Sequence, residues 1–263
     1  IIVGSIDKEQ KIKKNFQMFL KKFKCPIINM KYESAELTKI AINIYLASSI
    51  TTTNVLSKVC EKIDANWLDI IPALKLDKRI GKKAYVHPGL GISGGNIERD
   101  IFAIKKILKK ENVFNLLPNS FDKISSLMRL WIFRLLKKNN FIKKNISLGI
   151  LGLAYKAKTN SIKNSVAIEL IKKLPNDISI YDPKVKLEKD INRYKQTNKV
   201  EEIYKKSKII IIATPWPQFK SISNHLRTLR KNKTVIIDPY NLLNSSQFLQ
   251  NKIKYFSIGR NDN

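Results

Sequence analysis

The sequence has few cysteines and no long apolar run. Its two cysteines, Cys25 and Cys60, have a spacing that fits no metal site, and two cysteines make no disulfide framework. The longest purely aliphatic run, Ile209–Ile212, is far too short to span a membrane. Because nothing indicates an oxidising compartment or a membrane partner, we expect a cytoplasmic protein.

Acidic residues are scarce. The 21 acidic residues face 50 basic ones, which gives a net charge of +29. A field of that sign attracts nucleic-acid phosphates. However, only eight of the basic residues are arginines, and the lysines are spread over the whole chain. No zinc-finger spacing, aromatic RNA-binding motif or basic heptad helix is present. The pattern argues against nucleic acid as the main partner and leaves anionic ligands such as nucleotides open.

The chain does not begin with methionine, and no signal peptide opens it. Its first residues, Ile1–Val3, read as a short strand. A lysine-rich amphipathic helix is expected from about Asp7 to Phe23, followed by a short strand at Ile27–Met30. This order is typical of the end of a β-α-β domain. We therefore expect residues 1–30 to be the remnant of a domain whose body is missing.

Glycine is also scarce, with nine residues in all, yet four of them fall within seven positions: Gly89, Gly91, Gly94 and Gly95. They lie in the segment 85–100, and a helix-forming run follows at 101–110. Glycine accepts positive φ angles and lets a ligand approach the backbone. A loop that feeds a helix N-terminus also aims free N–H groups at an anion or a polarised oxygen. We interpret the segment as a ligand-facing loop; a tight structural turn is the alternative.

The region before this loop reads as helical. Ser34 is a helix-capping residue, and helix formers recur from there to Ile63. Lys39 and Asn43 are four residues apart on that helix and therefore share a face. They form either a solvated stripe or part of a site, and Asn54 lies three turns further on the same side. Further helices are expected at 66–74, 101–110 and 121–138.

The sequence pattern changes from mainly helical to alternating strands and helices after a basic, polar junction at 137–145. Strands are expected at 146–151, 178–181, 209–213, 235–238 and 255–258, with a helix at 164–174 and another helical stretch ending near Lys206. Strands alternating with helices predict an α/β fold with a doubly wound parallel sheet. Such sheets bind ligands beyond the carboxyl ends of their strands. We therefore divide the chain into residues 1–30, a helical domain at 31–140 and a Rossmann-like domain at 141–263.

Several motifs follow one another in a fixed order. They are S-A-E-L-T-K-I-A-I-N from Ser34, L-D-K-R-I-G from Leu76 with the P-G-x-G loop and Asp100, G-I-L-G-L-A-Y-K-A-K-T-N-S-I-K-N-S from Gly149, Y-D-P at Tyr181, A-T-P-W-P-Q-F at Ala213 and I-D-P-Y-N at Ile237. Each is weak alone, but their order and spacing are specific. Together they resemble the UDP-glucose/GDP-mannose dehydrogenase family over almost the whole chain.

The resemblance implies an activity and a domain order. Members of that family use NAD to oxidise C6 of a nucleotide sugar twice, from alcohol to aldehyde to acid, for polysaccharide precursors. The expected substrate is a UDP- or GDP-sugar. Residues 31–140 would be the central domain, which forms a homodimer through its long helix. Residues 141–263 would bind the nucleotide sugar, and residues 1–30 would be the tail of an N-terminal NAD-binding Rossmann domain.

The resemblance also implies roles for single residues. Lys39 and Asn43 match residues that hold the reacting oxygen and a water, and Asp100 matches the aspartate that positions this water and assists proton transfer. The positions implied to bind substrate are Arg79 (reaching into the neighbouring subunit), Tyr85, Gly89, Gly91, Gly94 and Lys156. The positions implied to lie near the cofactor are Arg99 and Lys163.

The sequence departs from the family at important positions. Asn96 stands where the family has its nucleophilic cysteine, and a carboxamide cannot trap an aldehyde as a thiohemiacetal. Lys163 and Tyr240 each replace an arginine, while Ser93 replaces a loop glycine and Glu98 a proline. The N-terminal Rossmann domain with its G-x-G-x-x-G motif is absent, so NAD would be bound mainly by that missing domain. We expect an enzyme limited to one hydride transfer; the alternative is a non-catalytic homologue that binds nucleotide sugar or dimerises.

Overall fold

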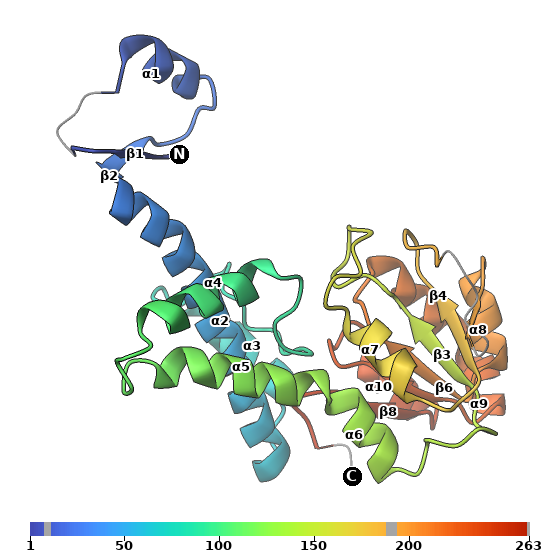
Figure 1. Cartoon of the computed structure of the whole chain (residues 1–263). Helices are drawn as coiled ribbons and strands as arrows, with labels where there is room; N and C mark the ends of the chain where they lie inside the picture. The colour runs from blue at the N-terminus through green and yellow to red at the C-terminus, as the bar shows by residue number, and fades with distance from the viewer. Residues whose placement is uncertain (8–11, 188–193, 262–263) are drawn as a thin grey trace. The chain divides into compact units, whose positions relative to one another are not determined.

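Two short parallel strands open the chain. The computed structural model describes residues 1–7, 12–187 and 194–261. Strand β1 (Ile2–Ser5) pairs in parallel with β2 (Ile28–Lys31), and helix α1 (Lys14–Lys21) connects them (Figure 1). The expected helix at 7–23 is thus shorter than predicted, and residues 8–11 of that prediction lie outside the described residues. These elements belong to a first compact unit, Ile1–Leu46, and the chain from Ala47 onward forms a second.

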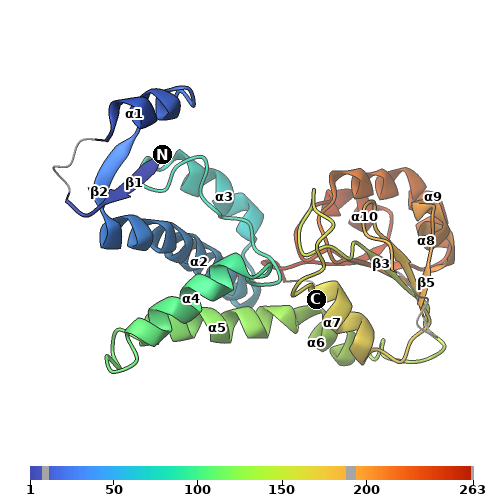
Figure 2. The ribbon, with the colours of Figure 1, turned by 45° about the horizontal axis from the view of Figure 1, so that its top comes forward.

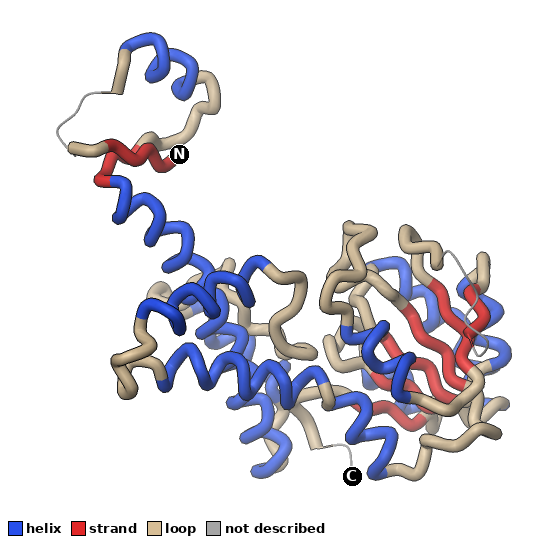
Figure 3. Tube along the Cα trace, in the orientation of Figure 1, coloured by secondary structure: helices blue, strands red, loops and turns tan. Residues whose placement is uncertain are grey.

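Helix α2 (Tyr32–Ile63) begins in the first unit and continues into the second. Before its sheet, the second unit is helical, as the blue tube of Figure 3 shows. Its helices there are α3 (Trp67–Leu76), α4 (Asn96–Ile107), α5 (Leu116–Arg129) and α6 (Trp131–Lys138). The single helix expected at 121–138 is wrong, because the chain bends at Leu130 (φ −86°, ψ 0°) between α5 and α6.

Helix α4 begins five residues earlier than predicted. Gly95 precedes it with a φ of 96°, a left-handed conformation that glycine adopts without strain. The chain therefore turns directly from the glycine loop into the helix. Asn96 becomes the first helical residue, and Asp100 lies on the helix rather than in the loop.

Among the described residues of the second unit, six strands form one sheet, and all of the pairs are parallel. In chain order they are β3 (Leu148–Leu151), β4 (Ile178–Tyr181), β5 (Tyr194–Gln196), β6 (Ile209–Ile212), β7 (Val235–Ile237) and β8 (Lys254–Phe256). Their spatial order is β5-β4-β3-β6-β7-β8. This order reverses between β3 and β6, as in a doubly wound nucleotide-binding sheet. The predicted fold class is confirmed, although β5 was not predicted.

Helices cover both faces of this sheet. Figure 2 shows α7 (Val166–Lys173) on one face and α8 (Val200–Lys206), α9 (Leu226–Lys231) and α10 (Ser245–Gln250) on the other; a 3-10 helix, η1 (Pro217–His225), precedes α9. Ile150, Ile180 and Ile211 are fully buried in the strands. Strands buried on both faces favour continuous aliphatic runs, which explains the four isoleucines of β6.

A smaller apolar cluster holds the helical part together. It contains Cys60, Trp67, Ile71 and Val86, and burial raises the pKa of the Cys60 thiol. The end of the described chain returns to this cluster, because Gly259 accepts a hydrogen bond from the backbone N–H of Trp67 at 2.8 Å. Among the described residues, no helix has both the length and the apolarity to cross a membrane.

Candidate functional site

Helices α2 and α3 hold the first half of the glycine loop. The hydroxyl of Thr53 donates to the carbonyl of Tyr85 at 3.0 Å, and the indole N–H of Trp67 donates to the carbonyl of Val86 at 2.8 Å. The backbone N–H of Gly89 donates to Oδ1 of Asn54 at 3.0 Å. These contacts fix the loop's backbone from Tyr85 to Gly89 against the helical domain.

Helix α5 holds the second half of the loop. The backbone N–H of Ile92 donates to Oγ of Ser125 at 2.8 Å, and Arg129 donates from Nη1 to the carbonyl of Ile92 at 3.1 Å. Gly91 has a φ of 83°, and a Cβ atom there would lie 2.7 Å from the carbonyl oxygen of Ser125. Glycine is therefore required at this position by both conformation and space.

Side chains of the Rossmann-like part cover the loop's other glycines. A Cβ atom at Gly94 would lie 2.3 Å from the ring of Tyr155, and one at Gly89 would lie 3.2 Å from the ring of Tyr240. A Cβ atom at Gly95 would lie 3.3 Å from the Cε atom of Lys163. The glycine loop therefore lies where the helical domain meets the loops that follow β3 and β7.

The loop after β3 is built by buried polar side chains from neighbouring strand ends. Oδ2 of Asp182 accepts from the backbone N–H groups of Leu153 and Ala154 at 2.6 and 3.1 Å. The hydroxyl of Thr214, at the end of β6, donates to the carbonyl of Ala154 at 2.6 Å. This construction presents Tyr155 at the position where the strand order reverses, which is the ligand-binding edge of such sheets.

A largely buried arginine joins the helical part of the second unit to the part that contains the sheet. Arg129, whose side chain is 13% exposed, forms ion pairs with Glu169 of α7 and, at 3.7 Å, with Glu98 of α4. Its Nη2 also donates to the carbonyl of Asn164 at 2.9 Å, and the Asn164 side chain donates to Glu98. The sequence reasoning missed this arginine. One sequence feature could have indicated it. Arginine is rare among the basic residues of this chain, and contacts that need a planar, forked donor require arginine rather than lysine.

The first five residues of α4 include Asn96 and Asp100, two of the residues singled out from the resemblance. Asn96 is exposed at the start of the helix, directly after Gly95. Asp100 is buried, with only 3% of its surface exposed, and Nε of Arg99 donates to its Oδ1 at 3.3 Å. The carboxylate is thus placed one helical turn from Asn96 on the element that the glycine loop feeds.

The remaining predicted residues lie at several places. Lys39 is exposed and Asn43 is half-buried, four residues apart on the part of α2 that belongs to the first unit. Arg79 is exposed and tied to Asp77, with Nη2–Oδ2 at 2.6 Å. This hydrogen bond lowers the pKa of Asp77. Tyr85 is half exposed, and the ammonium of Lys156 lies 5.5 Å from the ring centroid of Tyr155.

Tyr240 links the turn after β7 to the end of β6. Its hydroxyl donates to the carbonyl of Ala213 at 3.1 Å, and its backbone N–H donates to Asp238 at 3.2 Å. Burial raises the pKa of the Tyr240 phenol and also that of the Asp238 carboxyl, which accepts a further hydrogen bond from Tyr255 at 2.7 Å. A neutral phenol therefore occupies the position where the family has a cation.

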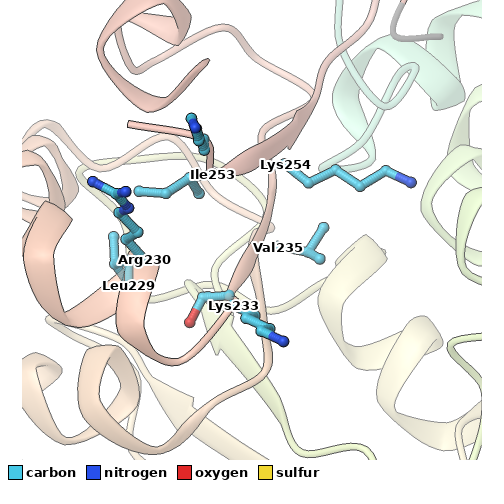
Figure 4. Close-up of a pocket in the computed structure, with 8 residues that line it drawn as sticks. Leu229, Arg230, Lys233, Val235, Ile253 and Lys254 are labelled. Carbon is cyan, nitrogen blue, oxygen red and sulfur yellow. The ribbon is translucent and has the colours of Figure 1, made fainter. Parts of the chain in front are cut away.

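A cavity of about 220 Å³ lies at the amino ends of β7 and β8, away from the carboxyl ends of the strands where the glycine loop packs (Figure 4). None of the predicted site residues lines it. Its walls are Leu229, Arg230, Lys233, Thr234, Val235, Lys252, Ile253 and Lys254. Among the described residues, no group of three or more histidine, cysteine or acidic side chains could hold a metal ion.

Two sequence models of one family match the chain. The central domain of the UDP-glucose/GDP-mannose dehydrogenase family matches residues 33–125, and its UDP-binding domain matches residues 149–245. The chain belongs to the UDP-glucose/GDP-mannose dehydrogenase family. The glycine loop and α4 thus lie in the family's central domain, and Tyr155, Lys156, Lys163 and Tyr240 lie in its UDP-binding domain.

Relatives of this dehydrogenase-family chain are longer than it is. UDP-glucose 6-dehydrogenase TuaD of Bacillus subtilis is 29% identical over 90% of this chain and 53% of its own length. The UDP-glucose 6-dehydrogenase of Rickettsia bellii is 29% identical over 98% of this chain and 62% of its own length. The chain therefore spans little more than half the length of these curated relatives.

Solved structures share the fold. A UDP-glucose dehydrogenase from Pyrobaculum islandicum superimposes with a TM-score of 0.80 at 22% identity, covering 98% of this chain and 58% of the other. A UDP-D-ManNAc dehydrogenase from Pyrococcus horikoshii superimposes with a TM-score of 0.77 at 23% identity, covering 100% and 60%. At such identities the likeness establishes the fold of this family member and nothing finer.

Proposed function

We propose that this chain forms the central and nucleotide-sugar-binding domains of an NAD-dependent dehydrogenase that oxidises C6 of a UDP-sugar. The observation that carries the proposal is the glycine loop, which the UDP-binding domain covers with Tyr155, Lys163 and Tyr240. The names of the curated relatives, which are UDP-glucose 6-dehydrogenases, support UDP rather than GDP as the base. Lys156, exposed beside Tyr155, is assigned to the substrate's phosphates.

The residues of this chain fit only part of an NAD site. The glycine-rich turn of a dinucleotide-binding domain follows that domain's first strand, and none of the described strands of this chain leads into a G-x-G-x-x-G turn. Exposed Lys163 and Arg99 lie at or near the start of α4, and both suit a phosphate group. We therefore assign most of the NAD site to the part of a full-length relative that this chain does not match, and only these two cations to the chain itself.

The reaction removes a hydride from C6 and a proton from its hydroxyl group. NAD supplies the hydride acceptor when it is bound. We assign to Lys39 and Asn43 the holding of the reacting oxygen and a water, as the resemblance implies. To Asp100, on the helix that follows the glycine loop, we assign the acceptance of the hydroxyl proton through a water. Its burial beside Arg99 supports this role, because a fixed carboxylate loses little entropy when it engages the water.

The exposed Asn96 limits the reaction to one oxidation. Conversion of the aldehyde to the acid proceeds in the family through a covalent adduct with a thiol, and a carboxamide nitrogen is not a comparable nucleophile. Cys60 cannot replace the thiol, because it is buried in the helical core and burial raises its pKa. The product of the proposed reaction is therefore the 6-aldehyde.

A second candidate function is nucleotide-sugar binding without turnover. Asn96 favours it, because a family member that has lost its nucleophile can retain the sugar pocket alone. Purified protein from the complete reading frame should be incubated with NAD and a panel of UDP- and GDP-sugars, while calorimetry measures binding of the same sugars. Turnover with at least one UDP-sugar supports the dehydrogenase. Binding without NADH formation supports the binder, and absence of both contradicts the two proposals.

We also propose that the protein is a homodimer through α2. Val55, Val59 and Ile63 recur every four residues on one face of this helix and are 43%, 44% and 68% exposed. An apolar stripe of this kind is typical of a helix–helix interface. In analytical ultracentrifugation at micromolar concentration, we expect a dimer for the wild type and a monomer for Val59→Lys/Ile63→Lys. A monomeric wild type would contradict this assignment.

A further inference from the structure

The turn between α4 and α5 exposes apolar side chains that the proposed function does not use. Ile107, Val113, Phe114, Leu116 and Leu117, here called the hairpin tip, are 71%, 75%, 69%, 66% and 55% exposed. These five side chains fall within the eleven residues 107–117, at the end of the helix pair farthest from the sheet (Figures 1 and 2). An exposed apolar group of this density marks a binding surface rather than a solvated loop.

The hairpin tip is held in a defined conformation. The side chain of Asn115 donates to the carbonyls of Lys105 and Leu108, both at 3.4 Å, which closes the turn on the end of α4. An ion pair between Lys105 and Asp122 joins α4 to α5 just behind it. The apolar side chains are therefore presented outward by a fixed scaffold, which lowers the entropic cost of binding.

Basic residues flank the hairpin tip. Lys106, Lys109 and Lys110 are exposed on the last turn of α4 and the residues after it. Glu111 is the single acidic residue between positions 105 and 117. Aromatic and aliphatic side chains beside lysines are the pattern of protein segments that insert into the interface of an anionic bilayer.

We propose that the hairpin tip docks this protein on the surface of an anionic lipid bilayer. Phe114 and Leu117 enter the boundary between headgroups and acyl chains, and Lys109 and Lys110 pair with lipid phosphates. Self-association through the tip is disfavoured, because two copies of the patch would bring their lysines together. A peripheral contact needs no membrane-spanning helix, so it is compatible with the finding that no described helix could cross a membrane.

The test is co-sedimentation with large unilamellar vesicles at about 0.15 M salt, where the Debye length is about 8 Å. Vesicles of phosphatidylglycerol and phosphatidylcholine are compared with phosphatidylcholine alone. We expect binding to the anionic vesicles, reduced at least about tenfold by Phe114→Ser/Leu117→Ser. Leu76→Ser/Leu249→Ser removes two exposed apolar side chains elsewhere and should leave binding unchanged. Circular dichroism checks that each variant is folded.

A second pair of variants separates the tip from the general positive charge. Lys109→Glu/Lys110→Glu and Lys172→Glu/Lys173→Glu change the net charge equally, and both remove adjacent exposed lysines near a helix end. We expect only the first to abolish binding. Equal loss in both would overturn the proposal in favour of non-specific attraction. Tip variants that keep vesicle binding but convert a dimer to monomers would assign the tip to a second copy of the protein. Tip variants that keep vesicle binding but no longer capture an acidic protein would assign it to that protein.

Discussion

Oδ1 of Asn54, a residue 2% exposed on α2, accepts the backbone N–H of Gly89 at 3.0 Å. On its other side, Gly89 lies against the ring of Tyr240 from the UDP-binding domain. One residue of the glycine loop is thus held between the central helix and the nucleotide domain. The loop's position therefore depends on both the helical part and the sheet part of the second unit.

Replacing Asn54 by leucine should destabilise the protein. The N–H of Gly89 would lose its acceptor, and leaving such a group unsatisfied costs about 1–3 kcal/mol. Ser57 provides a control one turn further along α2, since its fully buried hydroxyl has no hydrogen-bond partner among the described residues. Ser57→Ala should leave the free energy of unfolding in urea unchanged or slightly higher. Equal losses in the two variants would contradict the role given to Asn54.

Gly94→Ala should cost more stability than Gly81→Ala. Both glycines have a positive φ, 98° and 84°, so alanine is strained at either position. At Gly94 the added Cβ also meets the Tyr155 ring at 2.3 Å, whereas nothing lies within 4 Å of it at Gly81. Overpacking typically costs about 1–3 kcal/mol, and we expect a difference of that size in urea denaturation. UDP-glucose affinity should fall only in the first variant; comparable behaviour of the two would argue against close packing of the loop.

Arg129→Met should destabilise the second unit by at least about 2 kcal/mol, because two carboxylates and two backbone carbonyls lose a charged donor. Arg129→Lys should recover only part of that, since an ammonium cannot make the forked contacts. Arg134→Met is the control, because the exposed Arg134 donates only to the carbonyl of Leu127 among the described residues. A lysine variant as stable as the wild type would show that charge alone suffices.

The pKa of His87 should lie below its ordinary value of 6.5, because of its burial and the ammonium of Lys75, 3.4 Å from Nε2. As pH falls below about 6.5, the unfolded chain then binds this proton before the folded one. The contribution of His87 to stability is therefore present above that pH and is lost as pH falls through the folded pKa. The chain has two histidines, so ring titrations by NMR are readily assigned. Lys75→Gln should raise the midpoint of His87; an unchanged midpoint would exclude Lys75 as a cause.

The strands were easier to predict than the helix boundaries. Strand β4 has the predicted bounds, Ile178–Tyr181, because a short apolar run ends there at Asp182-Pro183. The three-residue β5 was missed, since an edge strand of tyrosine, lysine and glutamine has no apolar pattern. The break at Leu130 was also missed, because the apolar period runs on from α5 into α6.

The candidate site was predicted only in part. Motifs and glycines locate the loop, because positive φ angles and close approaches restrict a position to one residue type. The contacts that hold the loop, from Ser125, Arg129 and Asn54, come from positions distant in sequence, and no local pattern indicates which loop residue each of them bonds. Long-range hydrogen bonds of single polar side chains emerge only when the fold is known.

We propose that a member of this family with Asn96 at the nucleophile position performs one oxidation. The direct measurement is the number of NADH molecules formed per UDP-sugar consumed, with the product identified by mass spectrometry. We predict one NADH and a 6-aldehyde for the wild type, and two NADH and a uronic acid for Asn96→Cys. Two NADH and an acid from the wild type would contradict the account.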